Sequence, residues 1–309
     1  MSILNRIANK LKKTVNNPGD QSNSSKSEQT PTDYWTEHNV TLHKTFASKQ
    51  ESLDYLAWRV DQYPFYEKLM PCNSFDNKVI LDYGCGPGHD VVGFQEYSDP
   101  TKIIAMDVSS ASLAEAKDRI KLHKNSEKVE VILIEEKNQI PLKDGSVDYI
   151  HSSGVLHHTP DPVKILNDFH RILKPGGFCR IMVYNYNSIW AHLYVPFYLQ
   201  ILKGVHTGLS FKEAFKKSTD GENCPISNCY KPEEFIALCN QANFKAKFVG
   251  SAMSMTEMQI LTTRFDAMLN LEIKREHRDF LKELVFNEYQ HPIYKENIAG
   301  IVGVYELSK

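Results

Sequence analysis

Residues 79–88 read VILDYGCGPG, and this stretch decides the fold. Its apolar first half is typical of a buried strand, and three glycines spaced by two follow the strand at once. Because glycine has no Cβ, such a loop lets the backbone approach a ligand closely. A predicted helix begins at about Asp90, directly after the loop. A strand, a glycine loop and a helix in this order predict a ligand site at the carboxyl end of a strand in an open parallel sheet.

On both sides of this stretch, apolar runs of strand length alternate with segments of helical periodicity. Helices are predicted over 110–123 and 162–173, and strands over 78–83, 102–107, 129–134, 147–152 and 178–184, with further strands at 244–249 and 298–306. Such alternation predicts a parallel sheet that is covered on both faces. We therefore expect an α/β fold with a Rossmann-like, seven-stranded, mostly parallel sheet, helices on both faces and helical lid insertions.

Shifts in composition divide the chain into five segments. Residues 1–31 combine a basic amphipathic stripe with a linker rich in Ser, Asn and Gln, and we expect a basic helix followed by disorder. The other expected segments are a helical cap at 32–76, a ligand-binding core at 77–184, an aromatic lid or acceptor insertion at 185–231, and the end of the core at 232–309 with a helical insertion at 251–297.

The composition is ordinary for a globular protein, with 41% apolar residues, 24% charged residues and a formal net charge of −2. This near-neutral charge argues against a nucleic-acid binder that depends on phosphate attraction. The six cysteines form no CxxC pair, which favours a reducing, cytoplasmic location. Cys224 and Cys229 are close in sequence, but no second ligand pair follows them, so no metal site is expected.

A membrane span is not expected either, because no stretch reaches the roughly 20 apolar residues that a span needs. The basic stripe in residues 1–15 is compatible with peripheral contact to an anionic membrane surface, or with a solvated terminus. The oligomeric state is not predicted by any feature of the sequence.

The second predicted strand ends at Asp107, nineteen residues beyond Gly88. A carboxylate there can accept both ribose hydroxyls of a nucleoside, as it does in dinucleotide enzymes. Two features favour S-adenosylmethionine over a nicotinamide dinucleotide. The nicotinamide fingerprint wants a glycine where His89 stands. In addition, Asp82 at the mouth of the loop would repel a pyrophosphate but suits an ammonium group.

Residues 78–184 resemble the core of the class I S-adenosylmethionine-dependent methyltransferases. The resemblance runs through VILDYGCGPG, IIAMD, IPLKDGSVDYIHSSGVLHH and RILKPGGF in this order, and it densely covers about a third of the chain. It implies the fold and the cofactor but hardly constrains the acceptor. Position by position, it implies cofactor contacts from the glycine loop, from the ends of the strands and from an acid after the third strand, namely Gly84, Gly86, Gly88, Asp82, Asp107, Val108, Glu136 and Ser153.

In this assignment the glycines pass beneath the cofactor, while Asp82 lies near its amino group and Asp107 holds the ribose. Val108 lies against the adenine ring, Glu136 lies near the adenine amino group, and Ser153 lies near the methionine portion.

Candidate bases cluster after the fourth strand at His151, His157, His158 and Asp161. Histidine suits this role because its pKa lies near neutrality. The resemblance implies His157 as the base, with Tyr34 as a catalytic tyrosine. The alternative is that both adjacent histidines orient the loop through hydrogen bonds to the backbone.

The predicted function is methyl transfer to a small-molecule acceptor, at an oxygen of a sugar or glycan precursor, a quinone-type ring or a lipid-linked metabolite. Methylation at nitrogen or carbon, and a non-catalytic protein that senses S-adenosylmethionine, remain as alternatives. Residues 153–156 read SGVL, where enzymes that methylate base amino groups carry an Asn-Pro-Pro-Tyr-like motif, so a nucleic-acid acceptor is not expected.

Overall fold

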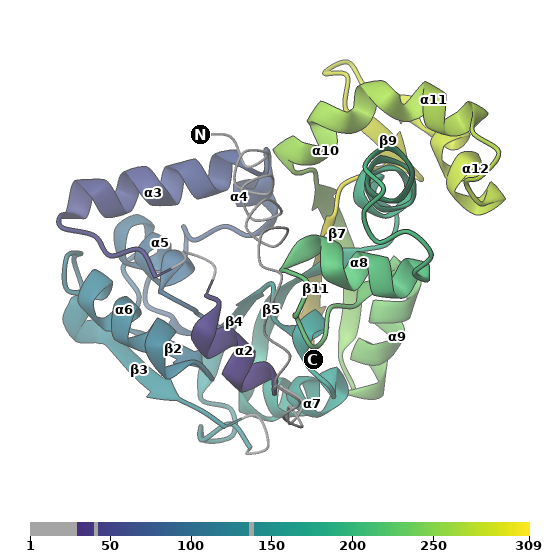
Figure 1. Cartoon of the computed structure of the whole chain (residues 1–309). Helices are drawn as coiled ribbons and strands as arrows, with labels where there is room; N and C mark the ends of the chain where they lie inside the picture. Colours follow the sequence, from purple (N-terminus) through teal and green to yellow (C-terminus); the bar gives the residue numbers. More distant parts are fainter. Residues whose placement is uncertain (1–29, 40–42, 136–138) are drawn as a thin grey trace, which may run out of the picture.

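The computed structural model describes residues 30–39, 43–135 and 139–309, and its centre is a mixed β-sheet (Figure 1). The order along the sheet is β3-β2-β1-β4-β5-β11-β7, with the short strand β6 paired beside β5. The strands are β1 (Val79–Tyr83), β2 (Lys102–Asp107), β3 (Val129–Leu133), β4 (Val147–Ser153), β5 (Leu173–Asn185), β6 (Cys229–Tyr230), β7 (Lys245–Ala252) and β11 (Val302–Ser308). The expected Rossmann-like sheet is confirmed.

Pairing within the sheet is parallel from β3 through β5, and only β11 runs antiparallel to its neighbours β5 and β7. The chain passes from β1 outward to β2 and β3, and then returns to the other side of β1 as β4. The connections that leave β1 and β4 therefore diverge. A crevice opens at such a switch point, at the carboxyl ends of the strands.

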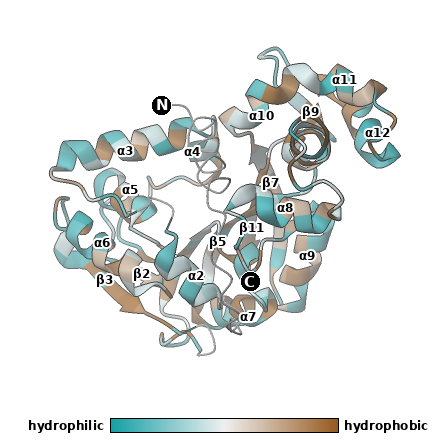
Figure 2. Cartoon of the chain, in the orientation of Figure 1, coloured by the Kyte–Doolittle hydropathy of each residue, from teal (hydrophilic) through white to brown (hydrophobic). Residues whose placement is uncertain are grey.

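Apolar residues alternate between the two faces of the sheet. Ile80 and Ile103 face a cluster that includes residues of α5 (His89–Tyr97) and α6 (Ser110–Ile120). Leu81 and Ile104 face the opposite cluster, with residues of α7 (Pro162–Ile172) and α9 (Pro232–Gln241). Figure 2 shows apolar residues along the strands and polar residues on outward-facing stretches of helices such as α6. Burial on both faces explains why the strands read as nearly continuous apolar runs.

Among the described residues, three helices precede the sheet, in or next to the segment expected as a helical cap. They are α2 (Pro31–Glu37), α3 (Lys49–Asp61) and α4 (Tyr66–Leu69). Helix α2 begins with a capping box in which Thr30 and Asp33 bond to each other's backbone N–H groups. Arg119 of α6 anchors α3, because its guanidinium donates to the side chain and the backbone carbonyl of Ser52.

A helical lid packs at the end of the sheet that contains β5, β11 and β7. It contains the wide π-helix η3 (Trp190–Leu202), α8 (Phe211–Thr219), α10 (Met255–Ile260), the short 3-10 turn η4 (Leu261–Thr263), α11 (Arg264–Leu269) and α12 (Arg275–Glu283). These helices lie together (Figure 1). They share their own apolar cluster. The buried carboxylate of Glu257 ties the lid to the sheet, because it accepts hydrogen bonds from the backbone N–H groups of Trp190 and Ile301.

The segment expected as a helical insertion also contains a small antiparallel sheet. Its strands are β8 (Val285–Phe286), β9 (Pro292–Tyr294) and β10 (Asn297–Ile298). Within the ranges that the structure describes, no helix is both long and apolar enough to cross a bilayer. The predicted basic helix in residues 1–15 and the predicted adenine contact Glu136 lie outside the described residues.

Candidate active site

The glycine loop between β1 and α5 adopts a backbone that side chains would disturb. Gly84 has φ +77°, and a Cβ built there would lie 2.1 Å from Cγ2 of Val155. Gly86 has φ +51°, and a Cβ there would meet nothing within 4 Å. Gly88 caps α5 in the left-handed conformation. Gly84 therefore lets the loop pack against the connection after β4, whereas the backbone at Gly86 is left open to a cavity.

Asp107 lies at the end of β2 and lines the same cavity. One carboxylate oxygen accepts a hydrogen bond from the Gly86 N–H at 2.8 Å, and the other accepts from the Ser109 N–H at 2.8 Å. Burial raises the pKa of Asp107, and these backbone donors oppose that rise. The carboxylate is thus fixed in place while its remaining lone pairs are free to accept further hydrogen bonds. Val108 lines the cavity beside it.

Asp82 lies on β1, directly before the loop, and is 1% exposed. Its Oδ2 atom has no hydrogen-bond partner in the described part of the chain. Burial raises the pKa of Asp82 to about 7, although nearby His151 favours the charged form. A buried acceptor without a donor is costly. Asp82 itself is not among the residues that line the cavity, so its predicted contact with the amino group of the cofactor stays a prediction.

Three ionisable side chains, His151, Asp90 and Arg59, form a cluster near Asp82. The Nε2 atom of His151 lies 3.3 Å from Oδ2 of Asp90, and a guanidinium nitrogen of Arg59 lies 3.5 Å from the other carboxylate oxygen. Burial lowers the pKa of His151, but Asp90 and Asp82 outweigh this effect and the net pKa is raised. Arg59 and Asp90 line the cavity, so charged side chains reach its wall near the glycine loop.

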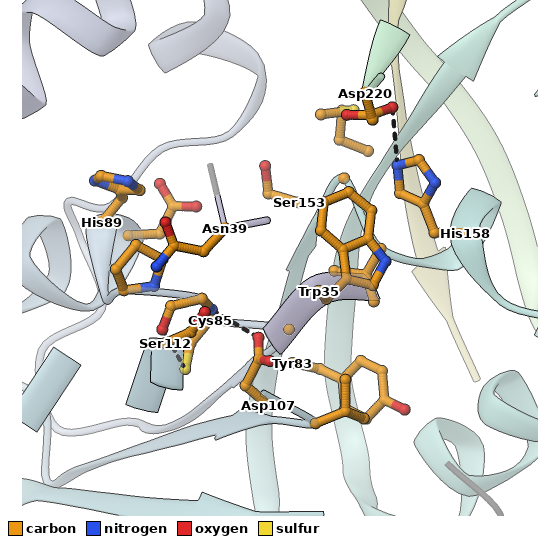
Figure 3. A pocket seen from close by; sticks show the side chains of 18 of the residues that line it. Trp35, Asn39, Tyr83, Cys85, His89, Asp107, Ser112, Ser153, His158 and Asp220 are labelled. Atoms are coloured by element: carbon orange, nitrogen blue, oxygen red, sulfur yellow. Dashed lines mark hydrogen bonds and ion pairs between the residues drawn. The ribbon is translucent and has the colours of Figure 1, made fainter. Parts of the chain in front are cut away.

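The cavity has a volume of about 410 Å³ and extends from the glycine loop to the lid (Figure 3). Its wall away from the loop is rich in aromatic side chains, namely Trp35, Trp58, Tyr63, Tyr66 and Tyr184. Ser153, at the end of β4, lies within it, and its hydroxyl lies 2.5 Å from the hydroxyl of Tyr66. This hydrogen bond joins the sheet to α4 across the cavity.

His158 lies at the end of the cavity opposite the glycine loop (Figure 3). It is the last residue of the 3-10 turn η2 (Leu156–His158). Its Nδ1–H donates to the carbonyl of Ile226 at 2.6 Å, and its Nε2 lies 3.4 Å from Oδ2 of Asp220. The hydroxyl of Tyr184 donates to the same carboxylate at 2.9 Å. The imidazole is held at one nitrogen and presents the other to a carboxylate.

His157, the base predicted from the sequence, does not line the cavity as His158 does. Its ring is fully buried, neither ring nitrogen has a hydrogen-bond partner among the described residues, and it is not part of the cavity wall. Burial, together with His158, lowers its pKa well below the usual value. Its ring centroid lies 3.9 Å from that of Tyr184. His157 therefore packs behind the wall, and its neighbour faces the cavity.

Tyr34, the predicted catalytic tyrosine, also lies behind the wall. It is 2% exposed, and its hydroxyl donates to the backbone carbonyl of Asp220 at 2.6 Å. Burial, with contributions from Cys224 and Asp220, raises its pKa far above the usual range. The neighbouring side chain, Trp35, lines the cavity instead. Tyr34 holds the Asp220 loop in place and keeps its proton.

Several lining residues were not predicted from the sequence. Asp220 lies in a loop that the sequence marks only as turn-like, although the pair Asp220-Gly221 is a usable turn signal. Tyr66 and Arg59 lie on helices whose faces could not be assigned without knowing what covers them. The sequence pattern identifies the loop and strand ends, but the partners contributed by the cap and lid require the fold.

The chain was compared with known proteins. A family model described as a methyltransferase domain matches residues 74–272, more than half of the chain. The chain belongs to this methyltransferase family. As the resemblance in residues 78–184 implied, it has the fold of the class I methyltransferases.

Two curated relatives illustrate the range of the similarity. A malonyl-[acyl-carrier protein] O-methyltransferase of Marinomonas sp. is 31% identical over 36% of this chain and 38% of its own length. A chloroplastic 2-methyl-6-phytyl-1,4-hydroquinone methyltransferase of Spinacia oleracea is 28% identical over 37% of this chain and 32% of its own length. The methyltransferase thus spans about a third of the length of these relatives.

Solved structures share the fold over a wider span. An S-adenosylmethionine-dependent methyltransferase from Mesorhizobium loti has a TM-score of 0.52 at 15% identity, covering 81% of this chain and 100% of the other. A possible histamine N-methyltransferase from Thermotoga maritima has a TM-score of 0.50 at 18% identity, covering 84% and 96%. At these identities the likeness concerns the fold.

Proposed function

We propose that the methyltransferase transfers a methyl group from S-adenosylmethionine to an oxygen atom of a small hydroxylated acceptor that carries a ring or other apolar surface. The observation that carries this proposal is the arrangement of the cavity, which joins the glycine loop at one end to the His158–Asp220 pair at the other. Sugar or glycan precursors, quinone-type rings and lipid-linked metabolites are the acceptor classes that we propose to test.

The cofactor half of the proposal assigns one group of the protein to each part of the donor. Asp107 accepts hydrogen bonds from the ribose hydroxyls, and Val108 lies against the adenine. The open backbone at Gly86 passes beneath the cofactor, and Asp82 neutralises its ammonium group. These assignments are supported by the exposure of Asp107 to the cavity and by the unpartnered Oδ2 of Asp82. S-adenosylmethionine supplies a methyl group on a positively charged sulfur, which is already activated for nucleophilic attack.

The protein's own task is to position the acceptor and take its proton. The Nδ1–H of His158 is fixed by Ile226, so the lone pair of the neutral ring is at Nε2, toward Asp220. A lone pair facing a carboxylate is favourable only when a positive charge lies between them. A proton taken from the acceptor hydroxyl meets this requirement, because the imidazolium that forms is stabilised by Asp220. We therefore assign the proton acceptor to His158, in place of His157.

The aromatic wall supports an acceptor with a ring. Trp35, Tyr63, Tyr66 and Tyr184 offer ring faces and edges around one polar end. The names of two relatives, a malonyl-[acyl-carrier protein] O-methyltransferase and a 2-methyl-6-phytyl-1,4-hydroquinone methyltransferase, agree with a small acceptor, and a third relative is named a tRNA U34 carboxymethyltransferase. Holding such an acceptor in line with the donor contributes on the order of 7–11 kcal/mol to lowering the barrier.

Transfer to an amine is the second candidate, and one observation favours it. The carboxylate of Asp220 lies beside the ring of Tyr184, and a carboxylate next to aromatic faces also suits a cationic amine. An amine would enter protonated and lose its proton to His158 before attack.

The test is methyl transfer from isotopically labelled S-adenosylmethionine to a panel of hydroquinones, phenols, sugars and amines of matched size. Mass spectrometry of the product identifies the methylated atom. Label on oxygen is the expected result. Label on nitrogen or carbon contradicts the oxygen assignment. Tight cofactor binding without adenosylhomocysteine release, with any acceptor class or with cell extracts, favours the sensor alternative.

A further inference from the structure

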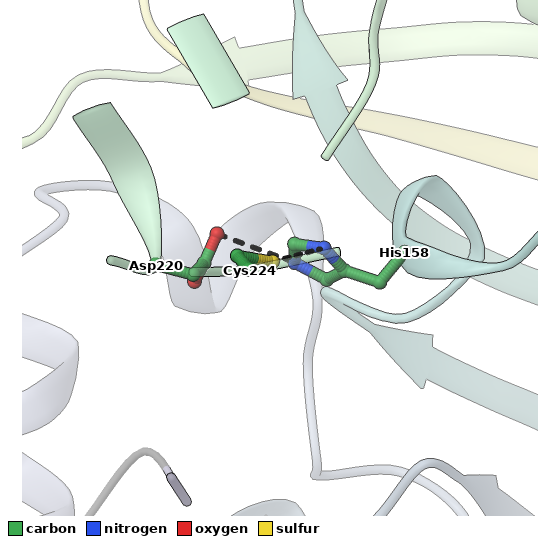
Figure 4. A group of neighbouring side chains, drawn as sticks. All are labelled: His158, Asp220 and Cys224. Atoms are coloured by element: carbon green, nitrogen blue, oxygen red, sulfur yellow. Dashed lines mark hydrogen bonds and ion pairs between the residues drawn. The ribbon is translucent and has the colours of Figure 1, made fainter. Parts of the chain in front are cut away.

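We propose that His158, Asp220 and Cys224 form a zinc site in the acceptor end of the cavity, and that zinc bound there inhibits methyl transfer. The inhibition rests on the proposed function, because it requires that His158 is the proton acceptor. The binding itself does not depend on that function. The three side chains come from η2 and from the loop after α8 (Figure 4).

The ligand atoms already lie close together. One atom of each residue, an imidazole nitrogen, a carboxylate oxygen and the cysteine sulfur, falls within 4.8 Å of the other two. Ligands bound about 2.0–2.3 Å from zinc lie roughly 3–4 Å from one another. The sulfur of Cys224 lies 3.9 Å from Nδ1 of His158, so its side chain must turn toward Nε2 to complete the site. The Nε2 of His158 and the Oδ2 of Asp220 are 3.4 Å apart and need no such movement. The lone pairs of these two atoms face each other, so a cation between them is favourable. Either a proton or a metal ion can be that cation.

Neighbouring groups hold two of the ligands through hydrogen bonds, as such groups do in known zinc sites. The histidine of such a site donates its other N–H to a carbonyl or a carboxylate, and its carboxylate ligand is itself hydrogen-bonded. Here Nδ1–H of His158 donates to Ile226 O at 2.6 Å, which directs Nε2 toward Asp220. The Tyr184 hydroxyl donates to the Asp220 carboxylate at 2.9 Å.

Cys224 gives the site its preference for zinc over harder ions. It is 1% exposed, and its thiol donates to Ile226 O at 3.3 Å. Cysteine thiols are mostly protonated at neutral pH. Zinc binds the thiolate, so binding releases one proton to solvent as the Zn–S bond forms. This grouping differs from the Cys224–Cys229 pair considered in the sequence, since Cys229 is not part of the cluster.

Three protein ligands leave one position on the ion open, as in catalytic rather than structural zinc sites. His158 and Asp220 line the cavity and Cys224 is buried, so the open position faces the cavity. The zinc ion would bind to Nε2 of His158, the atom that takes the proton of the methyl acceptor in the proposed reaction. Zinc and the acceptor proton therefore compete for the same atom, and occupancy by zinc stops proton removal.

Binding is tested first, without turnover. The full chain, treated with chelator, is dialysed against zinc chloride, and Co²⁺ serves as a spectroscopic probe. We expect one zinc per chain at micromolar concentration, a thiolate-to-cobalt charge-transfer band, and release of one proton per zinc. Cys224→Ser and His158→Gln should weaken zinc binding at least tenfold, whereas Cys229→Ser, the matched control, should bind as the wild type does. Absence of stoichiometric zinc binding, or wild-type binding by Cys224→Ser in a folded chain, overturns the proposal.

Inhibition is tested second, as the ratio of turnover with and without zinc for each variant, so that a change in basal activity cancels. We expect the ratio to fall at least tenfold for the wild type and for Cys229→Ser, and to stay near one for Cys224→Ser. Zinc that binds without lowering this ratio overturns the inhibitory role. If no acceptor is methylated at all, the proposed function fails, while the dialysis and the cobalt spectrum still decide the zinc site.

Discussion

The Nε2 atom of His158 lies 3.4 Å from the Oδ2 atom of Asp220, which joins the turn after β4 to the loop after α8. This contact closes the end of the cavity that lies opposite the cofactor loop (Figure 3). It also separates the roles of two adjacent histidines, because His157 is buried behind the wall. The contact therefore provides a direct test of which imidazole takes part in methyl transfer.

Replacing His158 with Gln should lower kcat by roughly 10²–10⁴-fold, the usual contribution of a positioned general base. Adenosylhomocysteine affinity, measured by calorimetry, should change little, because His158 lies at the opposite end of the cavity from the glycine loop. His157→Phe is the matched control, since it keeps a ring against Tyr184 and should retain kcat within about threefold. A large loss in His157→Phe with full activity in His158→Gln would reverse the assignment.

Asp107→Asn should weaken adenosylhomocysteine binding by roughly 10–100-fold, because hydrogen bonds to a charged group contribute about 1.5–3 kcal/mol each. The amide can still accept from the Gly86 or the Ser109 N–H, so the loop and the melting temperature should be nearly preserved. Calorimetry and thermal unfolding measure the two effects separately. Unchanged affinity would mean that the ribose lies elsewhere.

Two glycines of the same loop should respond differently to alanine. Gly84→Ala places a Cβ 2.1 Å from Val155 Cγ2 and should lower the free energy of unfolding by about 2 kcal/mol or more. Gly86→Ala meets open space and should cost only the left-handed backbone, about 1 kcal/mol. Its Cβ would, however, stand in open space at the wall of the cavity where we propose that the cofactor lies, so adenosylhomocysteine affinity should fall at least about tenfold. Urea unfolding measures the stability of both variants, and calorimetry measures their affinity for adenosylhomocysteine. Wild-type affinity in Gly86→Ala would contradict the expected contrast.

Cofactor affinity should depend on pH through Asp82. Burial raises its pKa to about 7, so the carboxyl is mostly protonated at pH 6 and mostly charged at pH 8. Only the charged form attracts the cofactor ammonium. Affinity for adenosylhomocysteine should therefore rise roughly tenfold from pH 6 to pH 8, with proton release near pH 7. Calorimetry in buffers of different ionisation enthalpy measures both quantities. Asp82→Asn should bind weakly at every pH, and an unchanged pH profile in this variant would point to another group.

The glycine loop and the strand ends of the candidate site were predictable because local sequence determines them. The run from Val79 to Gly88 specifies a strand, a loop and a helix start within ten residues, and Asp107 follows from the end of the next strand. β5 begins earlier than predicted, at Leu173, because Leu173 pairs with Val147 ahead of the Pro175-Gly176-Gly177 turn. Such a register shift depends on the neighbouring strand, which a one-dimensional pattern does not contain.

The acceptor half was not predictable in the same way. Whether His157 or His158 faces the cavity depends on the 3-10 geometry of η2, which spans only Leu156–His158. Asp220 reaches His158 only because η3 and α8 fold back over the sheet. The strands β8 and β10 contain two residues each, too few to show a period of two. These features depend on contacts between distant segments, so sequence periodicity carries little information about them.

The lid contains a pair of buried histidines that should make its stability depend on pH. Nδ1 of His277, on α12, lies 3.0 Å from Nδ1 of His192 on η3, so one ring donates and the other accepts and both are neutral. Burial lowers the pKa of His277 to about 4, while Glu276 opposes and Lys274 reinforces that shift. Burial, with the His277 neighbour, also lowers the pKa of His192 well below its usual value.

The folded state therefore favours neutral rings, whereas histidine in an unfolded chain titrates near pH 6.5. The contribution to stability is fully present above about pH 6.5 and is lost as the pH falls toward 4. From His277 alone, the free energy of unfolding should drop by about 2 kcal/mol between pH 7.5 and pH 5. Urea unfolding at the two pH values measures this drop. His277→Phe, which keeps a ring between His192 and Phe211, should lose most of the pH dependence that His277 contributes. An equal drop in the variant would show that the acid-sensitive group is not His277.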